Sequence, residues 1–180
     1  MAKQFDRISP DHRAFIENQH IFFVASAAAT GRVNLSPKGL DALRILTDTR
    51  VAYLDYTGSG NETAAHLRLD PRLTLMLCAF AGPPLILRLY GKGQSLGVGT
   101  PGFETLFTEA FASAPTLGAR QIVVLDVDLV QTSCGFGVPL YDYEGERDTL
   151  ARWAAAKGED GLIAYRREKN MRSIDGFPAA

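Results

Sequence analysis

Short apolar runs of strand length, separated by tight turns, occupy most of the first 130 residues. The runs predict six strands, at residues 20–27, 32–36, 51–56, 72–80, 85–94 and 121–130. Thr30-Gly31 and Gly82-Pro83-Pro84 supply turns of hairpin length. Strands joined by such short turns pair antiparallel with their neighbours, so the pattern predicts a mainly β fold, a six-stranded antiparallel barrel with flanking helices.

Four segments follow the helical period or carry helix start signals. Ser9-Pro10 begins a helix that we expect to run to about Gln19, and Thr100-Pro101 begins another, with apolar residues at helical spacing up to Phe111. Shorter helices are expected before Asp70-Pro71 and at residues 149–157, whereas residues 43–46 read as loop and Pro37 as a strand breaker.

We find no internal repeat and no linker that would separate a second domain. The chain is therefore expected to form a single domain over residues 1–180, with the barrel at about 20–130 and a helical and loop extension at about 131–180.

Composition narrows the class of partner. Nineteen Lys and Arg residues balance twenty Asp and Glu, which favours neither nucleic acid nor a membrane surface as a partner. The longest apolar runs are far shorter than a membrane-spanning helix, and the first residues lack the apolar core of a secretory signal. With only two cysteines among 180 residues, a cytoplasmic location is expected.

The segment from Thr57 to His66 carries the clearest candidate chemistry. It follows the strand 51–56, contains Gly58 and Gly60, and leads into the short helix. A strand, a turn of small residues and a helix start together favour an anion such as phosphate, because free backbone N–H groups and the helix dipole point to one place. The alternative is a strand-to-helix turn with a good cap and no ligand.

The same segment does not match the dinucleotide fingerprint. That fingerprint requires an acidic residue about 20 positions later to bind the ribose, and no Asp or Glu occurs from Pro71 to Phe103. No Gly-Lys-Ser/Thr follows either, so the turn is not a P-loop.

Other candidates are weaker when taken singly. Arg32, Ser36 and Lys38 on one strand could reach a phosphate or a ring carbonyl, or could simply be a solvated strand edge. Arg88 interrupts an apolar strand, and the basic tail from Tyr165 to Arg172 reads as a solvated face or an anion contact.

Neither metal binding nor covalent catalysis finds support. The three histidines show no ligand spacing with each other or with a cysteine, so no metal site is predicted. Cys78 is expected in the core, and Cys134 has no histidine close in sequence to activate it. No catalytic residue can be named.

The order of these segments resembles the pyridoxamine 5′-phosphate oxidase-like family of FMN-binding split β-barrels. The resemblance covers about residues 10–130. It rests on Ser36-Pro37-Lys38-Gly39, the Gly-Ser-Gly-Asn-Glu-Thr turn at 58–63, Ala65-His66-Leu67 before Asp70-Pro71-Arg72, and the strand that ends in Gly91-Lys92-Gly93.

The resemblance implies a homodimer that holds FMN at the subunit interface and oxidises or reduces a small molecule. The strand from Arg32 to Lys38 would line the flavin, and the turn from Ser59 to Thr63 would meet its phosphate. The cofactor-binding residues expected on this basis are Arg32, Asn34, Ser36, Lys38, Tyr53, Ser59, Gly60, Asn61, Glu62 and Thr63.

The chain also departs from the family pattern. Glu62 and Thr63 stand where the true oxidase has a basic pair, and the tail 170–176 lacks the Arg-Leu motif that holds pyridoxal phosphate. The substrate is therefore open, as are three alternatives: the same barrel with a deazaflavin, the same barrel with haem, or a non-catalytic flavin-binding module. The loop 134–139 and the tail 173–176 are expected to shape a lid over the flavin.

Overall fold

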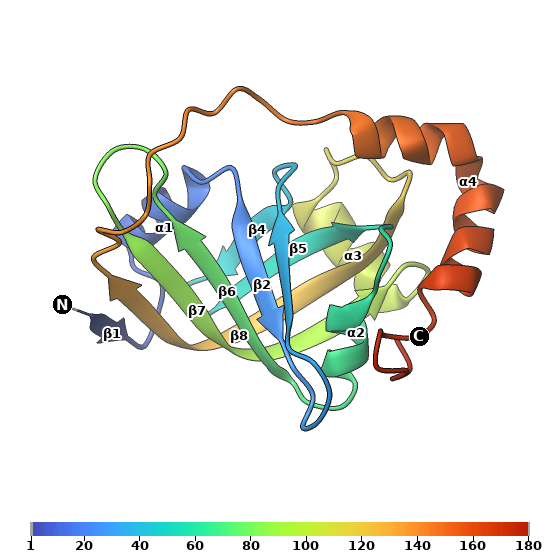
Figure 1. Ribbon diagram of the computed structural model, residues 1–180, viewed down its shortest axis with the longest axis horizontal. Helices are drawn as coiled ribbons and strands as arrows, with labels where there is room; N and C mark the ends of the chain where they lie inside the picture. Colours follow the sequence, from blue (N-terminus) through green and yellow to red (C-terminus); the bar gives the residue numbers. More distant parts are fainter. Residues whose placement is uncertain (1, 180) are drawn as a thin grey trace.

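A single antiparallel sheet organises the chain in the computed structural model, which describes residues 2–179 (Figure 1). Its strands are β1 (Lys3–Phe5), β2 (Phe22–Ser26), β3 (Asn34–Lys38), β4 (Leu43–Thr47), β5 (Arg50–Tyr56), β6 (Arg72–Cys78), β7 (Ile86–Gly97) and β8 (Ala119–Ser133). The order across the sheet is β3-β2-β6-β7-β8-β5-β4, with β1 paired to β8. The strongly curved sheet stays open between its two edge strands, β3 and β4, which confirms the mainly β, split-barrel fold class.

The sheet contains two strands, β1 and β4, in addition to the six that the pattern predicts. β1 is too short to produce a periodic signal, and β4 forms where a loop was expected, because Leu43 and Ile45 pack against the barrel core. Pro37 does not break β3 as expected. It lies opposite Phe23 within the edge strand, where its missing N–H costs no hydrogen bond to a further strand.

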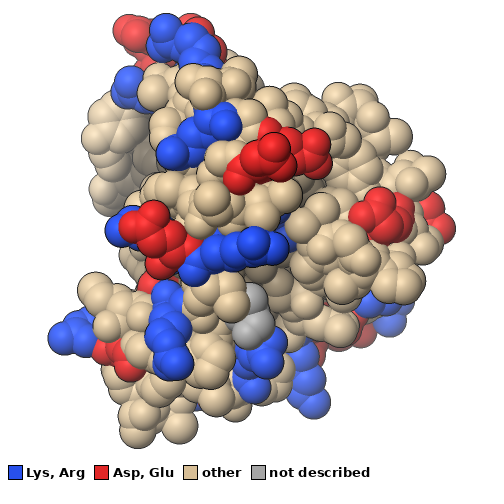
Figure 2. Space-filling view, turned by 90° about the vertical axis from the view of Figure 1, so that its right-hand side faces the viewer, with Lys and Arg blue, Asp and Glu red and all other residues tan. Residues whose placement is uncertain are grey.

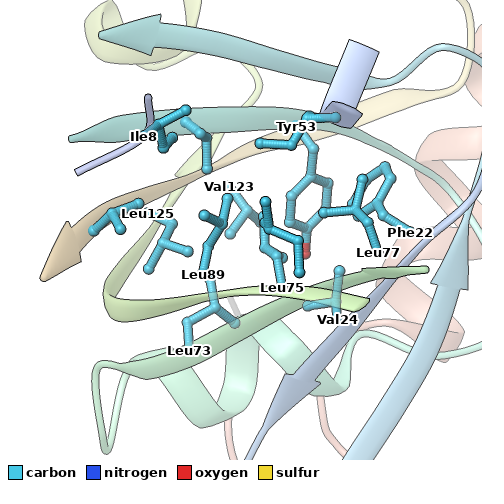
Figure 3. Close-up of a cluster of buried hydrophobic side chains, with 14 of the residues drawn as sticks. Ile8, Phe22, Val24, Tyr53, Leu73, Leu75, Leu77, Leu89, Val123 and Leu125 are labelled. Carbon is cyan, nitrogen blue, oxygen red and sulfur yellow. The ribbon is translucent and has the colours of Figure 1, made fainter. Parts of the chain in front are cut away.

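The barrel interior is filled by aliphatic side chains together with the rings of Phe22 and Tyr53 (Figure 3). Val24, Leu75, Leu87 and Leu89 are fully buried, and Tyr53 is 1% exposed with its ring edge-on to Phe22. Burying a side chain of this size contributes about 1.5–3 kcal/mol, so this cluster is the main stabilising element of the barrel.

A second apolar layer lies between the sheet and α3 (Pro101–Ala110). Ile122 and Val124 of β8 face this layer, whereas Val123 and Leu125 face the barrel interior. β8 is therefore buried on both faces along this stretch, which explains its continuous apolar run.

The remaining helices are α1 (Pro10–Glu17), α2 (Glu62–Leu67) and α4 (Thr149–Lys169). Ser9 caps α1 as predicted, by accepting a hydrogen bond from His12 N at 3.2 Å. α4 extends twelve residues beyond the expected helix at 149–157, with a kink at Gly158, whose φ of 65° lies in the left-handed region that suits glycine. No helix of residues 2–179 combines the length and apolar character needed to cross a membrane.

The segment after β8 runs the length of the molecule. Residues 134–148, here called the arch, cross from the end of β8 to α4 along one side of the barrel (Figure 1). The last residues, 170–179, return from α4 to lie beside α2. This part of the chain brings residues more than 100 positions apart in sequence to one end of the sheet.

Candidate functional site

A cavity of about 490 Å³ lies where β3, the end of β5 and the turn before α2 meet. Eight of the ten predicted cofactor-binding residues line it: Asn34, Ser36, Lys38, Ser59, Gly60, Asn61, Glu62 and Thr63. The fold therefore brings together two segments that sequence analysis linked only through the family resemblance. A volume of this size is in the range of small-molecule sites.

The polar side chains of β3 reach the cavity because strand residues alternate between faces. Asn34, Ser36 and Lys38 are half-buried, whereas the intervening Leu35 and Pro37 are exposed. Asn34 donates to Thr63 Oγ1 at 3.2 Å and accepts from Ser36 Oγ at 3.1 Å. Asn34 therefore ties the β3 face to the first turn of α2.

Asp55 stands at the centre of a buried ionic network beneath the cavity. Lys38 Nζ donates to its Oδ1 at 2.6 Å, and Arg120 Nε and Gln121 Nε2 donate to its Oδ2 at 2.9 and 2.8 Å. Burial alone would raise the pKa of Asp55, but the charges of Lys38 and Arg120 outweigh it and hold the pKa below its ordinary value. The carboxylate is therefore charged at neutral pH.

Arg120 and Asn170 hold the turn 57–61 in place. Arg120 Nη1 donates to Gly60 O at 2.7 Å and to Asn170 Oδ1 at 3.0 Å, and Asn170 Nδ2 donates to Gly58 O at 3.0 Å. These hydrogen bonds occupy the carbonyls of Gly60 and Gly58 and leave the N–H groups of the turn available to a ligand. Within residues 2–179, the N–H groups of Gly58, Ser59 and Gly60 donate to no backbone or side-chain acceptor.

Asn61 precedes α2 but does not cap it with its side chain. Its Oδ1 accepts from Gln121 at 2.9 Å and its Nδ2 donates to Asn170 O at 3.3 Å. The side chain is drawn into the buried network instead, and the start of α2 is left open toward the cavity.

The excess charge around the turn is positive. Arg166 of α4 donates to Thr57 Oγ1 at 2.9 Å, and its pKa is lowered first by burial and then by the nearby Arg120. Two arginines held close together favour an anion between or beside them. Figure 2 shows the face that carries α4 and the C-terminus, where basic side chains gather in a band with acidic ones interspersed.

Glu62 opposes this positive charge at the start of α2. Its carboxylate accepts the Ile174 N–H at 3.0 and 3.1 Å, so the tail docks directly on it. The tail also binds the tip of the β2–β3 hairpin, where Asp175 accepts from Arg32 N at 2.7 Å and from Arg32 Nη1. Gly31, with φ at 87°, leaves room for that carboxylate, which would lie 2.7 Å from a Cβ.

Arg32 and Tyr53 lie outside the cavity. Arg32 is exposed and bound to the tail, and Tyr53 points into the barrel interior because it shares a face of β5 with Val51. Burial, together with the Asp55 charge, raises the pKa of Tyr53 well above its ordinary value. Arg32 stays outside the cavity lining, whereas the centroid of the Tyr53 ring lies 5.8 Å from Nζ of Lys38, a residue of the β3 face.

Three residues of the site were missed by sequence reasoning, Asp55, Arg120 and Asn170, whereas Arg166 belongs to the basic tail for which an anion contact was one of the two expectations. Asp55 gave a usable signal, since a lone carboxylate inside an apolar strand requires a partner. Arg120 and Asn170 gave none, because their proximity to the turn depends on the pairing of β8 with β5 and on the path of α4.

The other candidates carry less chemistry. Arg88 donates to Ser133 Oγ at 3.0 Å, Cys78 is buried as expected, and Cys134 is exposed. Among residues 2–179, no three His, Cys, Asp or Glu side chains cluster in a way that could hold a metal ion.

Comparison with known proteins places this geometry in a family. The pyridoxamine 5′-phosphate oxidase family model matches residues 8–134. The pyridoxamine 5′-phosphate oxidase family protein ustO of Aspergillus flavus is 36% identical over 192 aligned residues, which cover 97% of this chain and 76% of that protein.

Solved structures of low sequence identity share the fold. A HupZ variant from group A Streptococcus superposes with a TM-score of 0.58 at 18% identity, covering 70% of this chain and 99% of that one. HutZ, a heme storage protein from Vibrio cholerae, superposes with a TM-score of 0.50 at 13% identity, covering 68% and 93%. The match over residues 8–134, the relatedness to ustO and the split-barrel fold establish that this chain belongs to the pyridoxamine 5′-phosphate oxidase family.

Proposed function

We propose that this protein is an FMN-dependent oxidoreductase that acts on a small molecule. The proposal rests on one observation: the polar face of β3 and the turn 57–63 form a shared cavity in a member of this family. FMN, when bound, supplies the redox chemistry, and the chain supplies binding, orientation and electrostatics.

The turn side of the cavity suits a phosphate. The N–H groups of Gly58, Ser59 and Gly60 have no acceptor within residues 2–179, and the Thr63 hydroxyl lies in the cavity wall. Lys38, Arg120 and Arg166 outnumber Asp55 and Glu62 around the turn by one positive charge. Backbone donors combined with an excess of positive charge are what a phosphate requires.

The β3 side of the cavity suits the polar edge of a flavin ring. Asn34 and Ser36 offer an amide and a hydroxyl that can donate or accept, and Lys38 offers a cation. These groups would orient the ring and tune its affinity for electrons. Because Asn34 and Lys38 are fixed by Thr63 and Asp55, they do not need to be ordered when the ligand binds.

We also propose that two copies of the chain form the working unit, with the cofactor at their interface. β3 is an edge strand, and the exposed Val33 and Leu35 lie on or beside it at 74% and 64% exposure. An apolar sheet edge is a surface that a partner chain covers. Light scattering in the presence of FMN should give twice the mass of one chain, and the mass of a monomer would contradict this assembly.

Haem is less well supported as the ligand. Iron in haem proteins takes a His, Cys, Met or Tyr ligand. Among the described residues that line the cavity, Tyr56 is the only one of these four types. The Tyr56 hydroxyl already donates to Pro115 O at 3.1 Å. A Soret band in the purified protein would nevertheless favour haem over FMN.

FMN titration of the wild type and a Thr63→Val variant tests the placement of the site. Thr63→Val removes a hydroxyl from the cavity wall and should weaken FMN binding by about fivefold to tenfold, the cost of one hydrogen bond. Thr74→Val, on β6 away from the cavity, serves as the matched control and should bind FMN like the wild type. Equal affinity in all three proteins would refute the placement.

A further inference from the structure

A second and larger cavity, of about 1580 Å³, lies beneath the arch. It shares Pro37, Lys38, Gly39, Leu40 and Leu150 with the cavity proposed for FMN, so the two spaces adjoin along the end of β3. A molecule in the larger cavity would therefore border whatever the β3 face holds. That this neighbour is a cofactor rests on the proposed function.

The arch is fixed over this space by specific contacts. Glu146 Oε2 accepts the Leu40 N–H at 3.3 Å, and Tyr141 N donates to Phe80 O at 2.9 Å. The Tyr143 ring stacks on His20 with centroids 3.6 Å apart and planes 7° from parallel. The arch thus forms a wall of the cavity and is held at more than one point.

The backbone at the junction of the two cavities is strained. Leu40 and Asp41 have φ of 61° and 49°, in the left-handed region that non-glycine residues rarely adopt. Leu40 lines both cavities, and its N–H is held by Glu146 of the arch. Strain of this kind persists where the surrounding structure enforces it, and it is concentrated at ligand sites.

The lining determines the class of ligand. Its walls carry a set of aromatic rings: Phe15, His20, Phe80, Tyr141, Tyr143 and Trp153. Its charged groups are two basic and two acidic side chains, Lys38, Arg147, Asp142 and Glu146, and Lys38 is already paired with Asp55. A phosphorylated substrate requires a surplus of cationic donors, which this lining lacks.

We propose that the cavity beneath the arch binds the substrate, and that the substrate is a planar, largely apolar molecule without a phosphate group. Tyr141 is 64% exposed and lies 5.5 Å from the Phe80 ring, so it presents an aromatic face to a bound ring. Trp153 is the only tryptophan of the chain and lines the same cavity, so its fluorescence reports on occupancy.

Titration with menadione, a neutral planar quinone, and with pyridoxamine 5′-phosphate tests the inference on the full chain. Menadione should quench Trp153 fluorescence to saturation, and pyridoxamine 5′-phosphate should not compete with it. Tyr141→Ser should raise the menadione Kd about tenfold by removing an aromatic contact, and Tyr141→Phe should restore binding. Phe136→Ser is the matched control, because Phe136 lies on the same arch at 82% exposure but outside the lining, and it should bind like the wild type.

Three outcomes would overturn the inference. Binding of pyridoxamine 5′-phosphate as tight as that of menadione would refute the substrate class. Equal effects of Tyr141→Ser and Phe136→Ser on menadione binding would refute the location of the substrate site. If Tyr141→Ser changed the oligomeric mass and left the quenching of Trp153 intact, the surface would be an interface between copies of the chain. A parallel FMN titration separates this result from the proposed cofactor: a wild-type protein that binds FMN but does not bind menadione refutes only the present inference.

Discussion

Asp55 and Glu62 are two carboxylates at one cavity with opposite consequences. The Asp55 side chain is 5% exposed and accepts hydrogen bonds from two cations and an amide. It therefore fixes Lys38 and Arg120 in position. Glu62 meets the backbone of the tail and has no cationic partner among the ion pairs of residues 2–179. Asp55 therefore holds the basic side chains of the site in position, whereas Glu62 places a negative charge beside the proposed anion site.

Removing the charge of Glu62 should strengthen FMN binding. Glu62→Gln keeps an oxygen that can accept the Ile174 N–H, but it removes a negative charge near the proposed phosphate position. We expect FMN to bind about threefold to tenfold tighter, with a smaller gain at high salt. Fluorescence titration at two ionic strengths measures both effects, and weaker binding by Glu62→Gln would place the phosphate elsewhere.

Asp55→Asn should destabilise the protein by about 3–5 kcal/mol, because it leaves Arg120 buried without a counter-charge. Urea denaturation measures the free energy of unfolding. Asp126→Asn is the control: Asp126 pairs with Arg50 at the surface, and its loss should cost less than about 1 kcal/mol.

The wild type and Asp55→Asn should differ in how their stability responds to acid. The pKa of Asp55 is lower in the folded than in the unfolded state, so its contribution is fully present above its unfolded pKa of about 3.9 and is lost as the pH falls through the folded pKa. Stability of the wild type should therefore drop more steeply below about pH 4 than that of Asp55→Asn. Parallel curves would show that the pKa of Asp55 is the same in the folded and the unfolded protein.

At the scale of elements, the β3 strand and the turn before α2 are joined by residues that come late in the sequence. Asn170 and Arg120 hold the turn, and the tail covers the side of α2 opposite the cavity through Phe177 and Ala179. The tail was expected to cover the flavin. It packs against Ala64 and Ala65 and binds the hairpin tip through Asp175, and its role as a lid stays a prediction.

Phe177→Ala should loosen the tail without unfolding the barrel. Phe177 packs against Ala64 and Ala65 and lies edge-on to the His66 ring, with centroids 6.4 Å apart. Amide hydrogens of residues 62–67 should exchange about tenfold faster in the variant, whereas those of β6 and β7 should be unchanged. Ile174→Ala, at a side chain 73% exposed, is the control and should leave exchange at α2 unaltered. Uniformly faster exchange across the sheet would mean that the tail is part of the global fold.

The elements and their pairing could be predicted largely from sequence because local signals and global fold agree. Caps at Ser9 and Thr100 and the apolar strand runs all appear where the structure has them. Leu43–Thr47 and Pro37 were read wrongly, since the burial of β4 and the edge position of β3 are properties of the assembled sheet, while β1 was not predicted and α4 is longer than expected. The polar network around Asp55 could not be predicted, because its members come from β3, β5, the turn, β8 and the tail.

For the whole molecule, the open side of the sheet, the cavity beside β3 and the larger cavity under the arch lie next to one another. The smaller cavity has a polar wall, which suits the proposed cofactor, and the larger has an aromatic one, which suits the proposed substrate. The family model matches residues 8–134, and the arch and α4 lie almost entirely beyond it, although the match to ustO covers 97% of the chain. We infer that the barrel sets the cofactor and that the extension sets the substrate.

The absorbance spectrum of the purified chain after incubation with FMN and removal of free ligand tests the central claim most directly. The account predicts the twin visible bands of a bound flavin, at about one FMN per chain, and their loss on addition of a nicotinamide donor. A colourless protein that retains no FMN, or a protein whose spectrum shows a Soret band, would contradict it.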